Sequence, residues 1–284
     1  MQERQASWTA TYTAIFRAAH QLLDATPKIL DDPVAVGLVE GASAADIHAQ
    51  AADFQQPLQR LARSLFVLRS RFAEDQLAEA VKTGVGQYVI LGAGLDTFAY
   101  RQPAWARTLR VIEVDHPASQ ALKRHYMQQA HMAIPANVAF CPIDFERMTL
   151  RQGLEAVAFD PQVPTFLSWL GVTQYLTSAA IAATLQGVLT LSAGSGMVFT
   201  FILPDASLAG DDLQAVTFYT ALAASRGEPW LTRFEPARLQ EWLQALGFAA
   251  VMHLAPSLAE ERYFTGRPDG LRAPIFEQLM YAVV

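Results

Sequence analysis

Residues 87–97 of the chain read Gln-Tyr-Val-Ile-Leu-Gly-Ala-Gly-Leu-Asp-Thr. Residues 88–91 form a continuous apolar and partly β-branched run, which is typical of a strand buried on both faces of a parallel sheet. Gly92 and Gly94 follow this run, where a chain that leaves a strand must turn tightly and let a ligand approach its backbone. A helix after such a turn can present free N–H groups to a polar or anionic ligand.

A second β-rich run, Arg-Val-Ile-Glu-Val-Asp at residues 110–115, ends in acids. Glu113 and Asp115 follow Gly92 by about 20 residues, the spacing of a βαβ unit whose second strand ends in a ribose-binding carboxylate. The two runs together predict a site for a nucleoside cofactor.

Four motifs indicate which nucleoside is bound. Gly-Ala-Gly-Leu-Asp-Thr at 92–97 is followed by Glu-Val-Asp-His-Pro at 113–117, Asp-Phe at 144–145 and Trp-Leu-Gly-Val-Thr-Gln-Tyr-Leu at 169–176. In this order they resemble the leucine carboxyl methyltransferase family, from about residue 7 to the C-terminus. The resemblance implies an S-adenosylmethionine-dependent O-methyltransferase of the family's bacterial branch. It also implies an α/β, doubly wound, Rossmann-like sheet of seven strands in the order 3-2-1-4-5-7-6, with an antiparallel seventh strand.

The same resemblance implies the cofactor contacts. Gly92 and Gly94 form the turn beneath the cofactor, and Asp115 is the acid that contacts it. Asp144 accepts a hydrogen bond from the adenine amino group, and the backbone N–H of Phe145 donates to a ring nitrogen. On its residues alone, Asp144 fits a helix N-cap equally well.

Residues 58–83 predict a long helix that carries Arg69 and Arg71 beside Glu74 and Asp75. Local ion pairs on a solvated face are one account of these arginines. The resemblance implies instead that one arginine holds the carboxylate of the cofactor's methionine moiety, which a guanidinium group suits well. Residues two apart on a helix point away from each other, so we expect only one to face the cofactor. The sequence leaves both assignments open.

Tyr175 matches the family tyrosine that lies near the transferring methyl group and the substrate. The alternative is a ring packed under the edge of the sheet. At Leu170 the chain departs from the family, which usually carries a glutamate there. Leucine cannot accept a hydrogen bond, so that contact is missing or is supplied by another residue.

At 284 residues the chain is long enough for one large α/β domain. We expect an N-terminal helical cover over residues 1–83, a cofactor-binding core over 84–204, and a C-terminal helix and strands over 237–284. Residues 205–236 break the alternation of strands and helices, at the place where the family builds its substrate cover. Phe218, Tyr219 and Trp230 are the candidate lining of that cover.

Composition disfavours several classes of protein. The net charge is -6 and no Lys/Arg block is present, so a nucleic-acid partner is not expected. Cys141 is the single cysteine and the six histidines lack ligand spacing, so neither a disulfide framework nor a metal site is expected. The longest apolar run, residues 197–203, is too short to span a bilayer. The N-terminus lacks the layout of a signal peptide, so we expect a cytoplasmic location. The oligomeric state stays open.

The predicted reaction is an in-line transfer of methyl to a carboxylate or hydroxyl of a small molecule. A carboxylate with a pKa near ~4 is already ionised at neutral pH and needs no general base. A hydroxyl acceptor would need one, at His116 or at a carboxylate not located in the sequence. Two alternatives stay open. A nicotinamide-dependent oxidoreductase is disfavoured by Thr97, which replaces the third glycine of its motif. A non-catalytic binding protein is suggested by Leu170.

Overall fold

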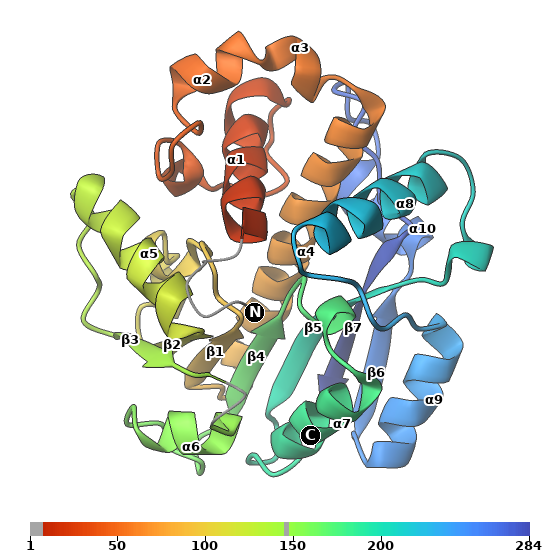
Figure 1. The fold of residues 1–284 in the computed structure, drawn as a ribbon. Coiled ribbons are helices and arrows are strands. Elements are labelled where there is room, and N and C mark those ends of the chain that lie inside the picture. Colours follow the sequence, from red (N-terminus) through yellow and green to blue (C-terminus); the bar gives the residue numbers. More distant parts are fainter. Residues whose placement is uncertain (1–7, 145–147) are drawn as a thin grey trace.

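The computed structural model describes residues 8–144 and 148–284, which form a seven-stranded sheet with helices on both faces (Figure 1). The strands are β1 (Gln87–Leu91), β2 (Arg110–Asp115), β3 (Val138–Pro142), β4 (Thr165–Trp169), β5 (Gly196–Ile202), β6 (Ala250–Leu254) and β7 (Glu277–Val283). Their order is β3-β2-β1-β4-β5-β7-β6, and β7 runs antiparallel to both of its neighbours. The expected fold class and strand order are thereby confirmed.

The helices before β1 are α1 (Trp8–Leu23), α2 (Ala44–Ala49), α3 (Ala51–Phe54) and α4 (Pro57–Lys82). The later helices are α5 (Pro117–Gln129), α6 (Leu150–Glu155), α7 (Ser178–Val188), α8 (Gly210–Ser225), α9 (Pro236–Leu246) and α10 (Pro256–Ala259). The sequence does not predict α6 or α10, because each is too short to show a helical period. Helix α6 begins at a capping box in which Thr149 and Gln152 bond each other's backbone N–H.

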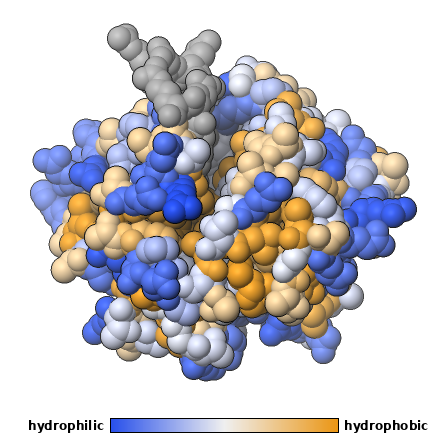
Figure 2. Space-filling view, turned by 90° about the horizontal axis from the view of Figure 1, so that it is seen from below, coloured by the Kyte–Doolittle hydropathy of each residue, from blue (hydrophilic) through white to orange (hydrophobic). Residues whose placement is uncertain are grey.

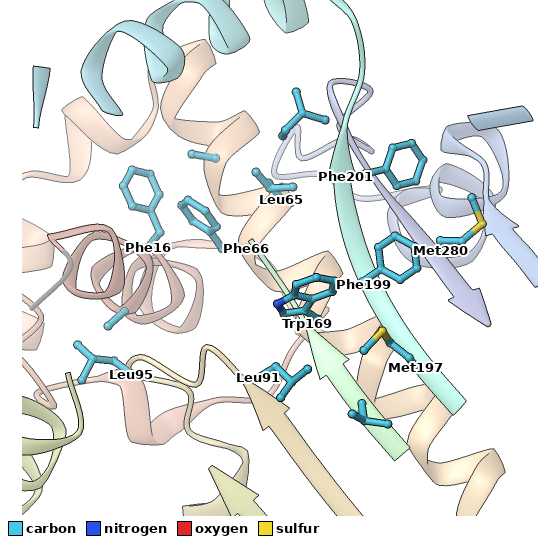
Figure 3. Close-up of a cluster of buried hydrophobic side chains, with 14 of the residues drawn as sticks. Phe16, Leu65, Phe66, Leu91, Leu95, Trp169, Met197, Phe199, Phe201 and Met280 are labelled. Atoms are coloured by element: carbon cyan, nitrogen blue, oxygen red, sulfur yellow. The ribbon is translucent and has the colours of Figure 1, made fainter. Parts of the chain in front are cut away.

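The sheet buries both of its faces, because successive side chains on a strand point to opposite sides. Val89 and Leu91 of β1 face one cluster, which Figure 3 shows with Trp169, Phe199 and other labelled residues. Tyr88 and Ile90 face the opposite cluster, under the second half of α4. The continuous apolar run of β1 thus serves two cores at once.

A buried charged cluster joins α1 to the turn after β1. Arg17 of α1 donates to a carboxylate oxygen of Asp32 at 2.9 Å and to the backbone oxygen of Leu95 at 2.5 Å. Arg101, which follows the same turn, pairs with Glu74 of α4 and lies 3.4 Å from Asp32. Removing one partner of such a buried pair leaves an uncompensated charge. Arg17 of α1 and Arg101, paired with Glu74 of α4, therefore anchor the turn to two different helices.

Apolar residues also reach the surface, and Figure 2 shows a group of them among hydrophilic ones on the face seen from below. Across residues 8–144 and 148–284, no helix is both long and apolar enough to cross a membrane.

Candidate cofactor and acceptor site

The turn after β1 requires glycine at two positions. Gly92 and Gly94 have φ angles of 67° and 46°, in the left-handed region that L side chains rarely adopt. A Cβ atom on Gly92 would lie 2.7 Å from Cγ2 of Val172, and one on Gly94 would lie 3.2 Å from Cβ of Ala10. The turn is therefore a close-fitting cradle, bordered by α1 and by the segment after β4.

Asp115 ends β2 and faces this turn. One carboxylate oxygen accepts the backbone N–H of Gly94 at 2.5 Å, and the other accepts that of His116 at 2.6 Å. Burial raises the pKa of Asp115, and the two N–H groups oppose that rise. The carboxylate thus stands at the carboxyl ends of β1 and β2, where parallel α/β sheets bind ligands.

Glu113, two residues earlier, has a different environment. Its carboxylate oxygen lies 2.7 Å from Nζ of Lys123, and both side chains are almost fully buried. This buried pair is part of the interior, so of the two acids at the end of β2 only Asp115 contacts the glycine turn.

Asp144 lies at the same edge of the sheet. The backbone N–H of Ile143 donates to the backbone oxygen of Asp115 at 2.9 Å, which places the end of β3 beside the end of β2. Asp144 follows directly. Phe145, the other half of the expected adenine contact, lies outside the described residues.

The two arginines of α4 point to opposite sides of the helix. Nη1 of Arg69 lies 3.5 Å from Oε1 of Glu277, and its guanidinium group packs against Gly171. Arg71 instead donates to Asp75 at 2.8 Å and to the backbone oxygen of Ile29, with 42% of its side chain exposed. The geometry separates the two residues as helical spacing predicts, and it places Arg69 on the side of Tyr175.

Arg69 and Tyr175 line one narrow cavity, whose open volume is about 40 Å³. Half of the described residues that line it are aromatic: Trp8 and Tyr12 of α1, Phe66 of α4, Tyr175, Tyr219 of α8, Trp230 and Phe276. This cavity adjoins the glycine turn, because Gly171 lines the cavity while the next residue, Val172, meets Gly92, and because the first turn of α1 contributes to both. Of the expected cover residues, Tyr219 and Trp230 line it, whereas Phe218 is 46% exposed.

Several polar atoms of these walls have no hydrogen-bond partner among the described residues. They are Nε1 of Trp8, Nε1 of Trp230, the hydroxyl of Tyr219 and Oε1 of Gln174. The indole of Trp230 approaches the Tyr175 hydroxyl, and the Tyr219 hydroxyl approaches that of Tyr12, without normal bond geometry. Buried polar atoms are nearly always bonded, so unpaired ones that gather in one cavity indicate room for a polar ligand.

The model of the leucine carboxyl methyltransferase family matches residues 10–189, more than half of the chain. The chain belongs to this family. YktD of Bacillus subtilis is named as an S-adenosyl-L-methionine-dependent methyltransferase. It is 30% identical over 302 aligned residues, which cover 99% of this chain and 98% of YktD. Rv0830 of Mycobacterium tuberculosis carries the same class of name and is 33% identical over 211 residues, covering 70% of this chain and 68% of its own.

Solved structures share the fold. A DUF574 family protein from Streptomyces avermitilis has a TM-score of 0.59 at 15% identity, covering 94% of this chain and 96% of its own. A structure described as a methyltransferase, from Thermobifida fusca, has a TM-score of 0.57 at 16% identity, covering 95% and 93%. The family and its relatives make this chain an S-adenosylmethionine-dependent methyltransferase, as the sequence predicts. The nicotinamide-dependent oxidoreductase is thereby removed as an alternative.

Glu277 lines the cavity of this leucine carboxyl methyltransferase homologue, and the sequence does not predict it as a site residue. Glu277, the first residue of β7, is 3% exposed and faces Arg69. Burial raises its pKa, and Arg69 and the Thr200 hydroxyl oppose that rise. The available signal is the pair of polar residues, Glu277 and Gln278, that opens an otherwise apolar strand. A strand pattern alone does not say that the first of them meets α4.

Leu170, where the chain departs from the family, lies elsewhere. It packs against the cluster of Tyr88 and Ile90 and is not one of the described residues that line the cavity. The carboxylate that faces Arg69 therefore comes from β7. His116, the base considered from the sequence, caps α5 by accepting the N–H of Ala118 at 3.2 Å, and it does not line the cavity either.

Proposed function

We propose that this methyltransferase transfers a methyl group to a carboxylate oxygen of a small molecule held beside Tyr175. The observation that carries the proposal is the pair of indole N–H groups, of Trp8 and Trp230, in the cavity that Tyr175 lines, because neither has a well-formed hydrogen bond to a described residue. Burial raises the pKa of Tyr175, so its hydroxyl stays protonated at neutral pH and can donate as well. Such donors suit an acceptor that arrives with oxygen lone pairs and no proton of its own.

The same geometry supports the proposed cofactor contacts. S-Adenosylmethionine, when bound, supplies a methyl group on a positively charged sulfur. The chain's residues fit it, because Gly92 and Gly94 leave no room for a Cβ and Asp115 presents a buried carboxylate at the ribose position. We assign the methionine carboxylate to Arg69, and the adenine edge to Asp144 with Phe145.

The chemistry of the cavity favours an acceptor that is already ionised. None of the described residues that line it is a lysine or a histidine. A carboxylic acid of ordinary pKa is ionised at neutral pH, so the protein needs only to align it and exclude water. Alignment and exclusion of water together can lower a barrier by several kcal/mol.

A second candidate, methylation of a hydroxyl group, rests on Glu277. A hydroxyl acceptor must lose a proton, and a buried carboxylate of raised pKa is a suitable general base. The ion pair with Arg69 opposes this role, because it stabilises the Glu277 carboxylate and so makes it a weaker proton acceptor. We therefore rank the carboxylate first.

The cavity must widen before an acceptor enters, since about 40 Å³ is room for little more than a water molecule. Its outer walls are α1 and α8, from the segments expected to cover the site. We propose that residues before β1 cover the cofactor and that residues 205–236 cover the acceptor.

The test is a methyl-transfer assay with S-adenosylmethionine labelled on the methyl group. Acceptors are offered in matched pairs, each carboxylic acid beside the corresponding primary alcohol. Mild base then distinguishes the products, because a methyl ester releases methanol and a methyl ether does not. We expect base-labile label from the acids. Base-stable label from the alcohols would favour Glu277 as a base, and cofactor binding without transfer across the panel would favour a binding protein.

The indole donors provide the structural control. Trp8→Phe and Trp230→Phe keep an aromatic ring in the wall and remove the indole N–H, together with the volume of the second ring. Each lost hydrogen bond to a charged acceptor costs about 1.5–3 kcal/mol, so kcat/KM for the acid should fall at least tenfold. Trp105→Phe is the matched control, because Trp105 is 38% exposed and lies against Phe98, away from the cavity. An equal loss in all three variants would contradict the proposed acceptor position.

A further inference from the structure

A second and larger cavity, of about 470 Å³, lies on the other side of α4. Its walls come from the loop after α1, from α4 and from residues 262–267. Four of its lining side chains are cationic: Lys28, Arg71, Arg262 and Arg267. We call this cavity the basic groove.

The charge of the basic groove is not balanced by its own walls. Asp75 is the one carboxylate among the described lining residues, and it already accepts hydrogen bonds from Arg71 and from the hydroxyl of Tyr263. Asp269, behind the lining, is bound to Arg267. The four cations thus outnumber these two acids in a chain whose net charge is -6.

Two of the cations have structural duties. Lys28 donates to the backbone oxygens of His20 and Asp24, and Arg267 donates to those of Ala25 and Pro27. They hold the loop after α1 in place. Burial lowers the pKa of Lys28; the charge of Asp24 opposes that fall, and the nearby charge of Arg267 adds to it. An anion in the basic groove would relieve this repulsion.

The other two cations are more exposed to solvent, although Arg71 also bonds the loop after α1 through the backbone oxygen of Ile29. Arg262 is exposed and makes no ion pair among the described residues; its guanidinium carbon lies 5.9 Å from the centre of the Tyr263 ring. Arg71 donates from Nε to Asp75 and from Nη1 to the backbone oxygen of Ile29, and 42% of its side chain is exposed. A guanidinium group offers five N–H donors in a planar fork that matches phosphate and carboxylate oxygens.

We propose that the basic groove binds a small organic polyanion that carries two or more phosphate or carboxylate groups. Two separated exposed guanidinium groups can each hold one anionic group. The volume of about 470 Å³ lies within the range of ligand cavities and far exceeds that of a single phosphate ion. The site is distinct from the methyl-transfer cavity, because Arg71 and Arg69 project from opposite sides of α4.

The experiment is calorimetric titration of the full-length protein at low ionic strength with sodium pyrophosphate, with citrate and with orthophosphate. Pyrophosphate and citrate separate phosphate from carboxylate recognition, and orthophosphate tests the need for more than one anionic group. We expect at least one polyanion to bind with a dissociation constant below about 1 mM and at least fivefold more tightly than orthophosphate.

Arg71→Met and Arg262→Gln should each weaken that binding at least fivefold while S-adenosylmethionine binding stays within twofold. Arg238→Gln is the matched control, since it removes one exposed positive charge from α9, outside the basic groove. If neither pyrophosphate nor citrate binds, the proposal is overturned. Equal weakening in Arg238→Gln, or orthophosphate binding as tight as that of the polyanions, would also overturn it. Thermal melting verifies that each variant is folded.

Discussion

Arg69 of α4 and Glu277 of β7 meet in the narrow cavity that Tyr175 lines, with Nη1 and Oε1 3.5 Å apart. The two residues are more than two hundred positions apart in the sequence. Their side chains are 12% and 3% exposed, so the pair is shielded from water on nearly every side. An N···O distance of 3.5 Å is long for an ion pair, so Glu277 compensates the buried charge of Arg69 only in part. The Arg69 guanidinium group can therefore bind an anionic ligand as well.

Substituting the two arginines separately tests this assignment. We expect Arg69→Met to raise the dissociation constant of S-adenosylmethionine at least tenfold, since a hydrogen bond to a charged group contributes about 1.5–3 kcal/mol. Arg71→Met should leave it within twofold, because Arg71 faces the basic groove. Calorimetric titration of both variants measures the difference. Equal effects would remove Arg69 from the cofactor site.

Substituting the two acids of β2 should have different effects, one on cofactor binding and the other on stability. Asp115→Ala should weaken cofactor binding about tenfold or more, because the carboxylate beside the glycine turn is lost. Glu113→Ala should lower the free energy of unfolding by about 3–5 kcal/mol, because it leaves Lys123 buried without its partner. Titration with cofactor and urea denaturation separate the outcomes. Unchanged cofactor affinity in a folded Asp115→Ala protein would contradict the ribose assignment.

Gly92→Ala should destabilise the protein, since the left-handed backbone costs an L-residue about 1–2 kcal/mol and the new Cβ would meet Val172. Gly187→Ala is the opposite control, because that glycine lies in α7 and a Cβ there meets nothing within 4 Å. It should stabilise the protein by about 0.5–1 kcal/mol. Urea denaturation measures both changes. A stable Gly92→Ala variant with normal cofactor affinity would show that the turn is not a cradle.

Glu277 predicts a pH dependence of stability. Burial raises its pKa in the folded protein. Between the unfolded and the folded pKa, Glu277 therefore binds a proton when the protein folds. Its contribution to stability is greatest below the unfolded pKa of about 4.3 and is lost as the pH rises through the raised pKa. Glu277→Gln removes this titration. The unfolding free energy of the parent minus that of the variant should therefore fall as the pH rises above the unfolded pKa of about 4.3.

Urea denaturation of both proteins across that range provides the measurement, and the other buried acids cancel in the difference. A difference that rises with pH would mean that the ion pair with Arg69 outweighs the cost of burying the Glu277 carboxylate.

The sequence by itself determined the sheet and the cofactor half of the site. Apolar runs ending at Gly92 and Asp115 define parallel strands, and the carboxyl ends of such strands meet at one edge by geometry alone. The turn and its acid could therefore be read from local order and spacing as a site for a nucleoside, and the resemblance to the family then implied S-adenosylmethionine.

Only the tertiary structure decided which residues face each other across the narrow cavity that Tyr175 lines. The helical pattern of α4 separates Arg69 from Arg71 but does not say which side meets β7. Glu277, Trp8 and Trp230 come from segments far apart in the chain, so no local period relates them. The basic groove, for the same reason, became visible only when the loop after α1 and residues 262–267 were placed beside Arg71.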